Sequence, residues 1–583
     1  MMMKLVLRLV VPLAALCLAL PLAGAPADSS ADRLVGLWKA KRWFEPDVRG
    51  PLIVQRAGDA FTADIAGRVI PIRVDGGELS FRLPNGEGSF RRRLTAGAIV
   101  GHWFAPEASP VRLHADGSNR WIGNVEPMEQ TFTFYLLIRK HEDGSFGVVL
   151  NNPERDHGAR LGVDRIVREG NLVKLIGKRE GQDRELVTGT YDSENDVISL
   201  SFPSRGGTFD FRRDGDESDF YPRGRNPPRY VYRPPPVRND GWATQGLEDA
   251  GIDRAAIEKT IQMMIDTPME SVDTPEVHAL LIARHGKLVL EEYFHGEHRD
   301  RLHDTRSASK SFVSLIAGAA IQAGKPLSTS TPVYQVMNGG TFPAGLEPRK
   351  RAMTLEHLLT MTSGYLCDDW ASDVPFNEDA MWDGEEKEPD FYRYALNLPM
   401  ARDPGEKTFY CSPGANLALG VVSRASGEPA LDLFDRLIAR PMKIDHYVWP
   451  INRAGQPYGG GGVRITARDF LKLGQLMLDG TWRGQRILGR EFAARASSPL
   501  YPFDKFRYGY LWWSLEYPYK DRKVRAFHAG GLGGQAVVVI PQLNLVIATF
   551  GANYNSAGNY YVQLEIIPKH VLPGVRSPGI RNP

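Results

Sequence analysis

The sequence changes character once, at a proline-rich segment, and this change limits the possible folds more than any other feature. Before it, from about residue 32 to 221, apolar and polar residues alternate in short runs such as Leu79–Leu83 and Val197–Phe202, separated by Asp-Gly or Asn-Gly pairs. Alternation with a period of two indicates β-strands, and these pairs favour tight hairpin turns. We therefore predict an N-terminal β-rich accessory domain over residues 28–221, built as an all-β barrel or sandwich.

Residues 222–245 form the proline-rich segment, which contains Pro234–Pro236. Successive prolines hold a chain extended, so we predict a stiff linker here. After it, runs with helical periodicity alternate with strand-like runs. Helices are expected over Ile252–Ile265 and Ser307–Gln322, a hairpin over Ala279–Phe294, and strands over Tyr508–Leu515, Val524–His528 and Ala536–Phe550. Strands at both ends predict an α+β domain over 246–572, in which an antiparallel sheet is flanked by helices and carries an inserted helical region.

The segment 1–27 has the pattern of a secretory signal peptide. Lys4 and Arg8 precede an apolar run over 9–22, and Ala25–Ala27 offers a small-residue cleavage site. An uncleaved membrane anchor is the alternative interpretation. Because no later run approaches about 18 apolar residues, we expect no stable membrane span after signal cleavage. The predicted location is periplasmic or secreted.

Net charge and cysteine content argue against two classes of protein, nucleic-acid-binding proteins and disulfide scaffolds. The formal net charge is +2, which argues against nucleic acid as a partner, because phosphate binding needs a basic face. Signal cleavage would leave Cys367 and Cys411 only, so the fold is not a disulfide scaffold. An oxidising compartment permits a bridge between these two cysteines, but the sequence does not test the distance that a bridge requires.

Three short motifs, in a fixed order, carry the candidate chemistry. Ser307 and Lys310 form the one Ser-x-x-Lys motif in the chain, and a helix starting here places both side chains on one face. About one such motif is expected by chance, so this motif alone is a weak signal. Tyr410 then opens a Tyr-x-Ser motif, and His528 opens the one His-x-Gly motif, on a predicted strand.

With these motifs, residues 246–565 resemble the serine β-lactamase and penicillin-binding protein superfamily. The resemblance is to its class C-like branch of esterases, D-amino-acid peptidases and 6-aminohexanoate-oligomer hydrolases. It extends to three further segments that are similar to segments of the family: 354–364, 460–469 and 508–513. The resemblance implies a β-lactamase-like fold for this half of the chain and a Ser307 nucleophile that forms an acyl-enzyme.

A serine hydroxyl needs a base within hydrogen-bond reach, and two assignments remain open. Lys310 could act as the neutral base, although a lysine is almost entirely protonated at pH 7 unless its pKa falls by about 3 units. Alternatively, Lys310 stays cationic and stabilises a Tyr410 phenolate that takes the proton. The sequence does not separate these assignments.

The resemblance also implies roles for the two later motifs. The backbone N–H groups of Ser307 and Gly531 would form the oxyanion hole, and His528 would stabilise the tetrahedral intermediate. Ser412 and Gly530 would contact the substrate. Ser412 stands where many relatives have Asn, and His528 where many β-lactamases have Lys, so a β-lactam is disfavoured as the natural substrate.

These observations predict an exported serine hydrolase that cleaves a small-molecule amide, ester or peptide substrate. One alternative is a D-alanyl peptidase or penicillin-binding protein acting on cell-wall peptides. Another is a non-catalytic binding or sensor protein of the same fold. No cofactor is expected. Metal binding by His295, His298 and His303 is possible, but we favour a polar loop and predict no metal site.

An acidic stretch lies between the Ser-x-x-Lys and Tyr-x-Ser motifs. Residues 368–390 contain ten acidic side chains and a single base, Lys387. Such charge runs are usually solvated loops, and we favour that interpretation. The alternative is an acidic lid that attracts cationic groups of a substrate.

Overall fold

The structure is a computed structural model, and it describes residues 31–44, 48–95, 97–128, 130–154, 161–371, 373–554 and 557–577. The predicted signal peptide, 1–27, lies outside the described residues. The chain divides into two compact units. The first comprises the described parts of Met1–Trp38, Leu136–Val149 and Gly162–Arg213, and the second comprises those of Lys39–Tyr135, Leu150–Leu161 and Asp214–Pro583. Among the described residues, no helix is long and apolar enough to cross a membrane.

The β-rich half forms two closed barrels, where the sequence predicts one barrel or sandwich. One barrel consists of β2 (Gly50–Ala57), β3 (Ala60–Ile65), β4 (Arg68–Asp75), β5 (Glu78–Arg82), β6 (Ser89–Thr95), β7 (Ala98–Phe104), β8 (Ala108–Ala115) and β9 (Arg120–Val125). The other consists of β1 (Gly36–Phe44), β10 (Gln130–Lys140), β11 (Phe146–Asn151), β12 (Val163–Glu169), β13 (Leu172–Arg179), β14 (Gln182–Asp192), β15 (Val197–Phe202) and β16 (Gly207–Arg213). Buried rings such as Phe90 and Trp103 pack in the core of the first barrel. The all-β prediction for this half is confirmed.

The second half is built on a nine-stranded sheet, as the α+β prediction requires. In spatial order its strands are β17 (Ala243–Thr244), β19 (Lys287–Tyr293), β18 (Val277–Arg284), β30 (Leu545–Gly551), β29 (Gln535–Ile540), β28 (Arg522–Gly531), β27 (Trp513–Tyr519), β26 (Phe506–Tyr508) and β25 (Tyr501–Phe503). All neighbours are antiparallel except β17 and β19. Because β18 pairs with β30, strands from the two ends of the domain share one sheet.

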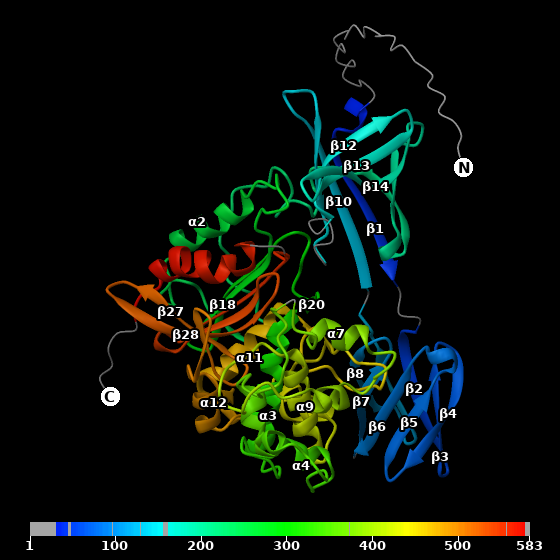
Figure 1. The fold of residues 1–583 in the computed structure, drawn as a ribbon, viewed down its shortest axis with the longest axis vertical. Helices are drawn as coiled ribbons and strands as arrows, with labels where there is room; N and C mark the ends of the chain where they lie inside the picture. The colour runs from blue at the N-terminus through cyan, green and yellow to red at the C-terminus, as the bar shows by residue number, and fades with distance from the viewer. Residues whose placement is uncertain are drawn as a thin grey trace, which may run out of the picture. The chain divides into compact units, whose positions relative to one another are not determined.

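Helices cover both faces of this sheet, because alternate side chains of each strand point to opposite faces. On β18, Leu280 and Ile282 pack in a core with α2 (Arg254–Ile265) and the C-terminal helical segment η8 (Val562–Val571). Leu281 and Ala283 pack in the other core, with α11 (Ala467–Asp479), α3 (Lys310–Gln322) and α9 (Ser412–Ser426). Figure 1 shows α2 and the red C-terminal segment on one side of the sheet and α11 on the other.

The inserted helical region lies between β19 and β25 along the chain. Besides α3, α9 and α11 it contains α4 (Val333–Met337), α5 (Pro348–Ala352), α6 (Leu355–Leu359), α7 (Glu378–Asp383), α8 (Phe391–Asn397), α10 (Ala430–Phe434) and α12 (Arg490–Ala496). α11 packs closely on β29, because a Cβ added at Gly474 would lie 2.3 Å from Val537 Cγ2. α11 is capped at both ends: Thr466 accepts the N–H of Asp469, and the helix ends at Gly480 with φ 78°.

Three local predictions differ from the structure. The strand expected over Tyr508–Leu515 is interrupted, because β26 ends at Tyr508 and β27 begins at Trp513. The single strand expected over Ala536–Phe550 is a hairpin, β29 and β30, because Pro541 opens a short helical turn and Asn544 adopts a left-handed conformation with φ 47°. The proline-rich segment, predicted to be a linker, also packs against the second half of the chain. Tyr232 is buried, and its hydroxyl donates to the Val289 carbonyl oxygen at 2.8 Å. Part of the predicted linker is therefore packed into the core of the second half.

Candidate active site

Ser307 lies in a 3-10 turn, η4 (Arg306–Ser309), which leads directly into α3. Lys310 is the first residue of α3, is almost fully buried, and donates from Nζ to Ser307 Oγ at 3.1 Å and to the Gly460 carbonyl oxygen. Arg306 has φ 50°, which is unusual for a residue other than glycine, and its N–H is held by Asp304 Oδ1 at 2.8 Å. The predicted hydroxyl–amine pair is thus assembled at the start of the helix.

Tyr410 precedes α9, and its ring lies beside the Lys310 side chain. Its ring centroid lies 4.7 Å from Lys310 Nζ. Burial lowers the pKa of Lys310, but its interactions with Tyr410, Glu378 and Asp369 outweigh burial and raise the pKa overall. Lys310 is therefore an ammonium ion at neutral pH, which favours the assignment in which lysine stays cationic beside the tyrosine.

The third motif lies on β28, where its glycines permit close packing. A Cβ at Gly531 would lie 2.3 Å from the Thr305 carbonyl oxygen and 3.0 Å from the Ala308 nitrogen. A side chain at this position would therefore clash with the turn that carries Ser307. The chain brings the Gly531 backbone against that turn, as an oxyanion hole shared by these two residues requires.

His528 lies opposite Trp513 in the β27–β28 pair. Burial lowers the pKa of His528 to about 4, so the ring is neutral at pH 7. Its Nδ1 has no hydrogen-bond partner among the described residues. A Cβ at Gly530 would lie 3.0 Å from His528 Cδ2, so this glycine packs against the imidazole. A neutral ring with an unused nitrogen can donate or accept a hydrogen bond from a bound substrate.

Ser412 is placed differently from what a substrate contact requires. It is fully buried, and its Oγ and N–H both donate to Asp369 Oδ2, at 2.6 and 2.8 Å. Asp369 in turn donates its own N–H to the Tyr410 carbonyl oxygen at 2.7 Å. In this structure Ser412 therefore fixes Asp369 behind the tyrosine, and the role of Ser412 toward substrate remains a prediction.

Two carboxyl groups, Asp369 and Glu378, are site residues that the sequence analysis missed. Asp369 Oδ1 accepts the N–H of Glu378 at 2.8 Å, and Glu378 Oε1 accepts the Tyr458 hydroxyl at 2.6 Å. Burial raises the pKa of both carboxyl groups, and the charge of Lys310 opposes this shift. Nothing in their spacing sets them apart from the other acids of 368–390, so the sequence gives no signal that would have selected them.

A disulfide joins Cys367 to Cys411, with a Cα–Cα distance of 5.4 Å. The bridge that the sequence left open is therefore present. Asp369 follows one cysteine by two residues, and Tyr410 precedes the other. The disulfide consequently ties the start of the acidic stretch to the tyrosine of the site.

Aromatic rings border the catalytic groups. Trp370 is 55% exposed and stacks on Tyr410 with ring centroids 4.9 Å apart and on Trp513 at 5.9 Å. Phe503 meets Trp370 edge-on at 5.0 Å. Of the Trp512–Trp513 pair, Trp513 belongs to this cluster, whereas Trp512 is fully buried against Phe527. An exposed, planar surface thus lies next to the tyrosine.

The outer part of the acidic stretch is paired with arginines. Glu385 and Glu386 lie within 3.7 and 3.3 Å of Arg453, and Glu388 lies 2.6 Å from Arg393. These ion pairs reduce the local negative charge. The inner acids, by contrast, belong to the site itself.

The α+β sheet with helices on both faces is that of the β-lactamase fold, and the Lys310 ammonium group lies between the Ser307 hydroxyl and the Tyr410 ring. A model of the Beta-lactamase family matches residues 263–557, about half of the chain. The chain belongs to the Beta-lactamase family.

Individual relatives cover parts of the chain. Over 212 residues it is 26% identical to a 6-aminohexanoate-dimer hydrolase from Paenarthrobacter ureafaciens, with 35% of this chain and 52% of that protein covered. The chain thus matches about half the length of this curated relative. It is similar to the solved structure of EstCE1, a hydrolase with promiscuous acyltransferase activity (17% identity, TM-score 0.40, 53% of this chain and 96% of that one). A penicillin-binding protein homolog from Caulobacter crescentus is also similar (14% identity, TM-score 0.39, 51% and 91%).

Proposed function

We propose that this protein is an exported serine hydrolase that cleaves a small amide or ester through an acyl-enzyme at Ser307. The observation that carries the proposal is the contact of Lys310 Nζ with Ser307 Oγ at 3.1 Å beneath the Tyr410 ring. A nucleophile and a proton acceptor on either side of one lysine ammonium group are the groups that acyl transfer needs. The intact set disfavours the alternative of a non-catalytic binding protein.

In the proposed mechanism, the Tyr410 phenolate takes the proton of Ser307 while the Lys310 ammonium stabilises the phenolate. Ser307 Oγ attacks the carbonyl carbon, and the resulting oxyanion accepts the N–H groups of Ser307 and Gly531. The tetrahedral intermediate collapses as Tyr410 returns the proton to the leaving amine or alkoxide. Water then cleaves the Ser307 ester by the same sequence of proton transfers.

The surroundings of the site favour a substrate with an apolar or planar group. Trp370 and Trp513 offer stacking surfaces beside Tyr410. The neutral His528 carries no charge to bind a substrate carboxylate, which disfavours D-alanyl peptides and β-lactams. The relative from Paenarthrobacter ureafaciens is a hydrolase of 6-aminohexanoate dimers, and we propose that this chain likewise acts on a short, linear amide or ester.

Covalent labelling tests the proposal. A fluorophosphonate probe should modify wild-type protein once, at Ser307, as located by mass spectrometry, and Ser307→Ala should not be labelled. Ser314→Ala is a matched control on α3, the helix that follows Ser307, because the Ser314 hydroxyl has no hydrogen-bond partner in the described part of the chain. Labelling at Ser309 or Ser412 in the Ser307→Ala variant would refute the assignment. Nitrocefin, D-amino-acid amides and p-nitrophenyl esters then separate the substrate classes.

We propose export from the pattern of residues 1–27, and the Cys367–Cys411 disulfide supports it, since structural disulfides persist in oxidising compartments. Cell fractionation should find the full chain outside the cytoplasm, and a chain lacking residues 2–27 should remain inside.

A further inference from the structure

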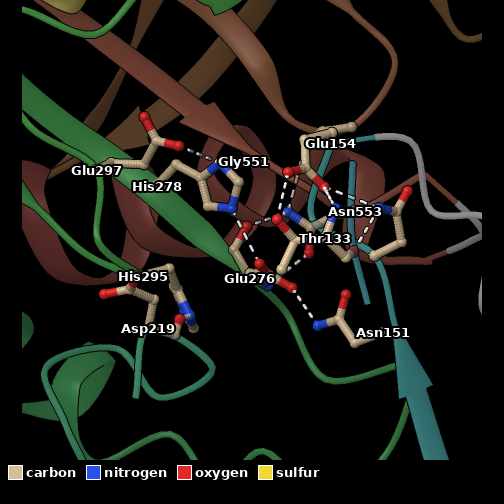
Figure 2. Close-up of polar contacts among 12 residues, drawn as sticks. Thr133, Asn151, Glu154, Asp219, Glu276, His278, His295, Glu297, Gly551 and Asn553 are labelled. Atoms are coloured by element: carbon tan, nitrogen blue, oxygen red, sulfur yellow. Dashed lines mark hydrogen bonds and ion pairs between the residues drawn. The ribbon is translucent and has the colours of Figure 1, made fainter. Parts of the chain in front are cut away.

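A histidine–carboxylate cluster lies just upstream of the nucleophile and takes no part in the proposed mechanism. His278 is on β18, His303 is on β20 (His303–Asp304), and Glu297 lies in the segment between β19 and β20. One ligand atom from each of the three side chains lies within 4.8 Å of the others. His278 Nδ1 is 2.9 Å from His303 Nε2 and 3.9 Å from Glu297 Oε1. Figure 2 shows the His278 ring between Glu297 and Glu276.

The outer contacts of the two rings fix which nitrogens carry hydrogen. His278 Nε2 is 2.9 Å from Glu276 Oε1, and His303 Nδ1 is 3.1 Å from the Asp304 carbonyl oxygen. A carboxylate and a carbonyl only accept, so both of these ring nitrogens donate. The two nitrogens that face each other are then lone pairs in the neutral rings, with the Glu297 carboxylate beside them. Two facing lone pairs beside a carboxylate repel one another, so a cation among the three groups would stabilise the arrangement.

We infer that His278 Nδ1, His303 Nε2 and Glu297 bind a divalent transition-metal ion of the zinc class, with water as the fourth ligand. Two imidazoles and one carboxylate are a ligand set that zinc prefers. Ligands about 2.0 Å from a tetrahedral ion lie roughly 3.3 Å apart, between the two distances observed here. Small side-chain rotations close the site around an ion.

The surrounding contacts are those that support a metal-bound histidine. Glu276 orients His278 from the far side, as carboxylates do in many zinc sites. Glu276 is itself held, because Asn151 Nδ2 donates to its Oε2 at 2.8 Å and its N–H donates to Asn553 Oδ1 at 2.7 Å (Figure 2). Arg301 Nε lies 3.3 Å from Glu297 Oε1, the oxygen that also faces His278 Nδ1, so the arginine holds this carboxylate in place.

A shared proton is the alternative to a metal ion between the two rings. Without a metal, one proton between the two rings would supply the required cation. The ion would replace this proton and tie β18 to the segment that leads into Ser307, which makes the proposed role structural and independent of the proposed hydrolysis.

The test uses the full chain, stripped with a chelator, dialysed and titrated with Zn²⁺ and with Co²⁺ as a spectroscopic probe. One equivalent of Zn²⁺ should bind and raise the Tm, and Co²⁺ should give the d–d absorption of a tetrahedral site. Glu297→Gln and His303→Gln should weaken binding by at least about tenfold, and Glu276→Gln by about 10- to 100-fold. His298→Gln is the matched control, because His298 is exposed on the same segment and should bind as the wild type does.

Two results would overturn the inference. One is wild-type protein that binds no Zn²⁺ and shows no change in Tm, which would leave a shared proton as the only cation. The other is binding lost equally in His298→Gln. If a variant fails to fold, a crystal of wild-type protein measured at the zinc absorption edge decides, because the anomalous peak must lie between His278 and His303. Fluorophosphonate labelling of the stripped protein tests the serine chemistry separately.

Discussion

Lys310 carries its charge where water is excluded, and nearby acidic groups compensate for it. Asp369 and Glu378 are buried near it, and Tyr410 lies against its ammonium group. An isolated buried lysine would lose its proton, so these neighbours decide its ionisation. The protonation state of Lys310 therefore depends on side chains outside the three motifs.

The first prediction concerns the tyrosine and the lysine themselves. Tyr410→Phe removes the proposed proton acceptor and Lys310→Ala removes the charge that stabilises it. Each should lower kcat/KM for a p-nitrophenyl ester by at least about 10², the usual contribution of a general acid–base group. Circular dichroism should show unchanged folding for Tyr410→Phe. A rate within a few-fold of wild type in either variant would contradict the assigned roles.

The second prediction concerns pH. Glu378→Gln keeps an acceptor for the Tyr458 hydroxyl but removes a negative charge that raises the pKa of Lys310. The pKa of the lysine should fall, so the alkaline limb of the pH profile of kcat/KM should move to lower pH. The paired acid Glu388 offers a control, since Glu388→Gln should leave the profile unchanged. An unshifted limb in Glu378→Gln would show that this carboxyl does not act on the lysine.

At the scale of elements, the period of the apolar residues predicted most helices and strands, because local sequence largely determines them. Asp253 caps α2 and Thr466 caps α11, as their sequences suggest. The Ser-x-x-Lys, Tyr-x-Ser and His-x-Gly motifs meet because three elements, α3, α9 and β28, converge. The break at Pro541 has a signal in the sequence, because Gln542 and Asn544 interrupt the apolar run directly after it. Asp369 and Trp370 could not be selected, because only tertiary packing and the Cys367–Cys411 disulfide bring them to the site.

The third prediction tests that disulfide. Replacing Cys367 and Cys411 together by Ser removes a cross-link with a sequence separation of 44. The free energy of unfolding should fall by about 2–4 kcal/mol in denaturant titrations, in the range for loops of this size. Acylation should also slow, because Trp370 and Asp369 lose their tether to the tyrosine. Equal stability of the reduced and oxidised wild type would exclude this role.

The fourth prediction concerns the outer acidic stretch. If it were a lid for cationic groups, kcat/KM for an amine-bearing substrate would fall with salt more than that for a neutral ester, since salt screens such steering. Glu385, Glu386 and Glu388 are already paired with Arg453 and Arg393. We therefore expect the triple Gln variant to change kcat/KM for the amine-bearing substrate by less than about twofold, with the wild-type dependence on salt retained. A larger change would support the hypothesis that the acidic stretch is a lid that attracts cationic groups.

At the scale of the whole molecule, the barrel formed by β2–β9 belongs with the hydrolase half in one compact unit. Ala108 and Trp449 exchange both backbone hydrogen bonds, each at 2.8 Å. His102 Nε2 lies 2.8 Å from the Tyr447 hydroxyl, and Glu107 pairs with Arg464. The proline-rich composition of residues 222–245 predicts a spacer between two separate domains. Instead, these contacts join the β2–β9 barrel to the second half of the chain, and Tyr232 of the segment itself is buried.

The fifth prediction tests whether the contacts between the β2–β9 barrel and the second half of the chain stabilise the protein. Glu107→Ala leaves the largely buried guanidinium of Arg464 without its carboxylate, which should lower the free energy of unfolding by about 3 kcal/mol. Glu516→Ala breaks an exposed pair with Lys523 and should cost less than about 1 kcal/mol. A chain that starts at Asn239 loses both the barrel and Tyr232 and should be far less stable than the full chain. Full stability of that shorter chain would show that the barrel is dispensable.

The pairing of β18 with β30 also has a consequence for synthesis. The ribosome makes Ser307 and Lys310 long before β28, which carries Gly531, and β30, which completes the centre of the sheet. A nascent chain therefore has its proposed nucleophile early, but it lacks the strand proposed to stabilise the oxyanion until β28 has been made. Products of premature termination before residue 551 should be inert, so the proposed hydrolytic activity requires a chain that includes β30.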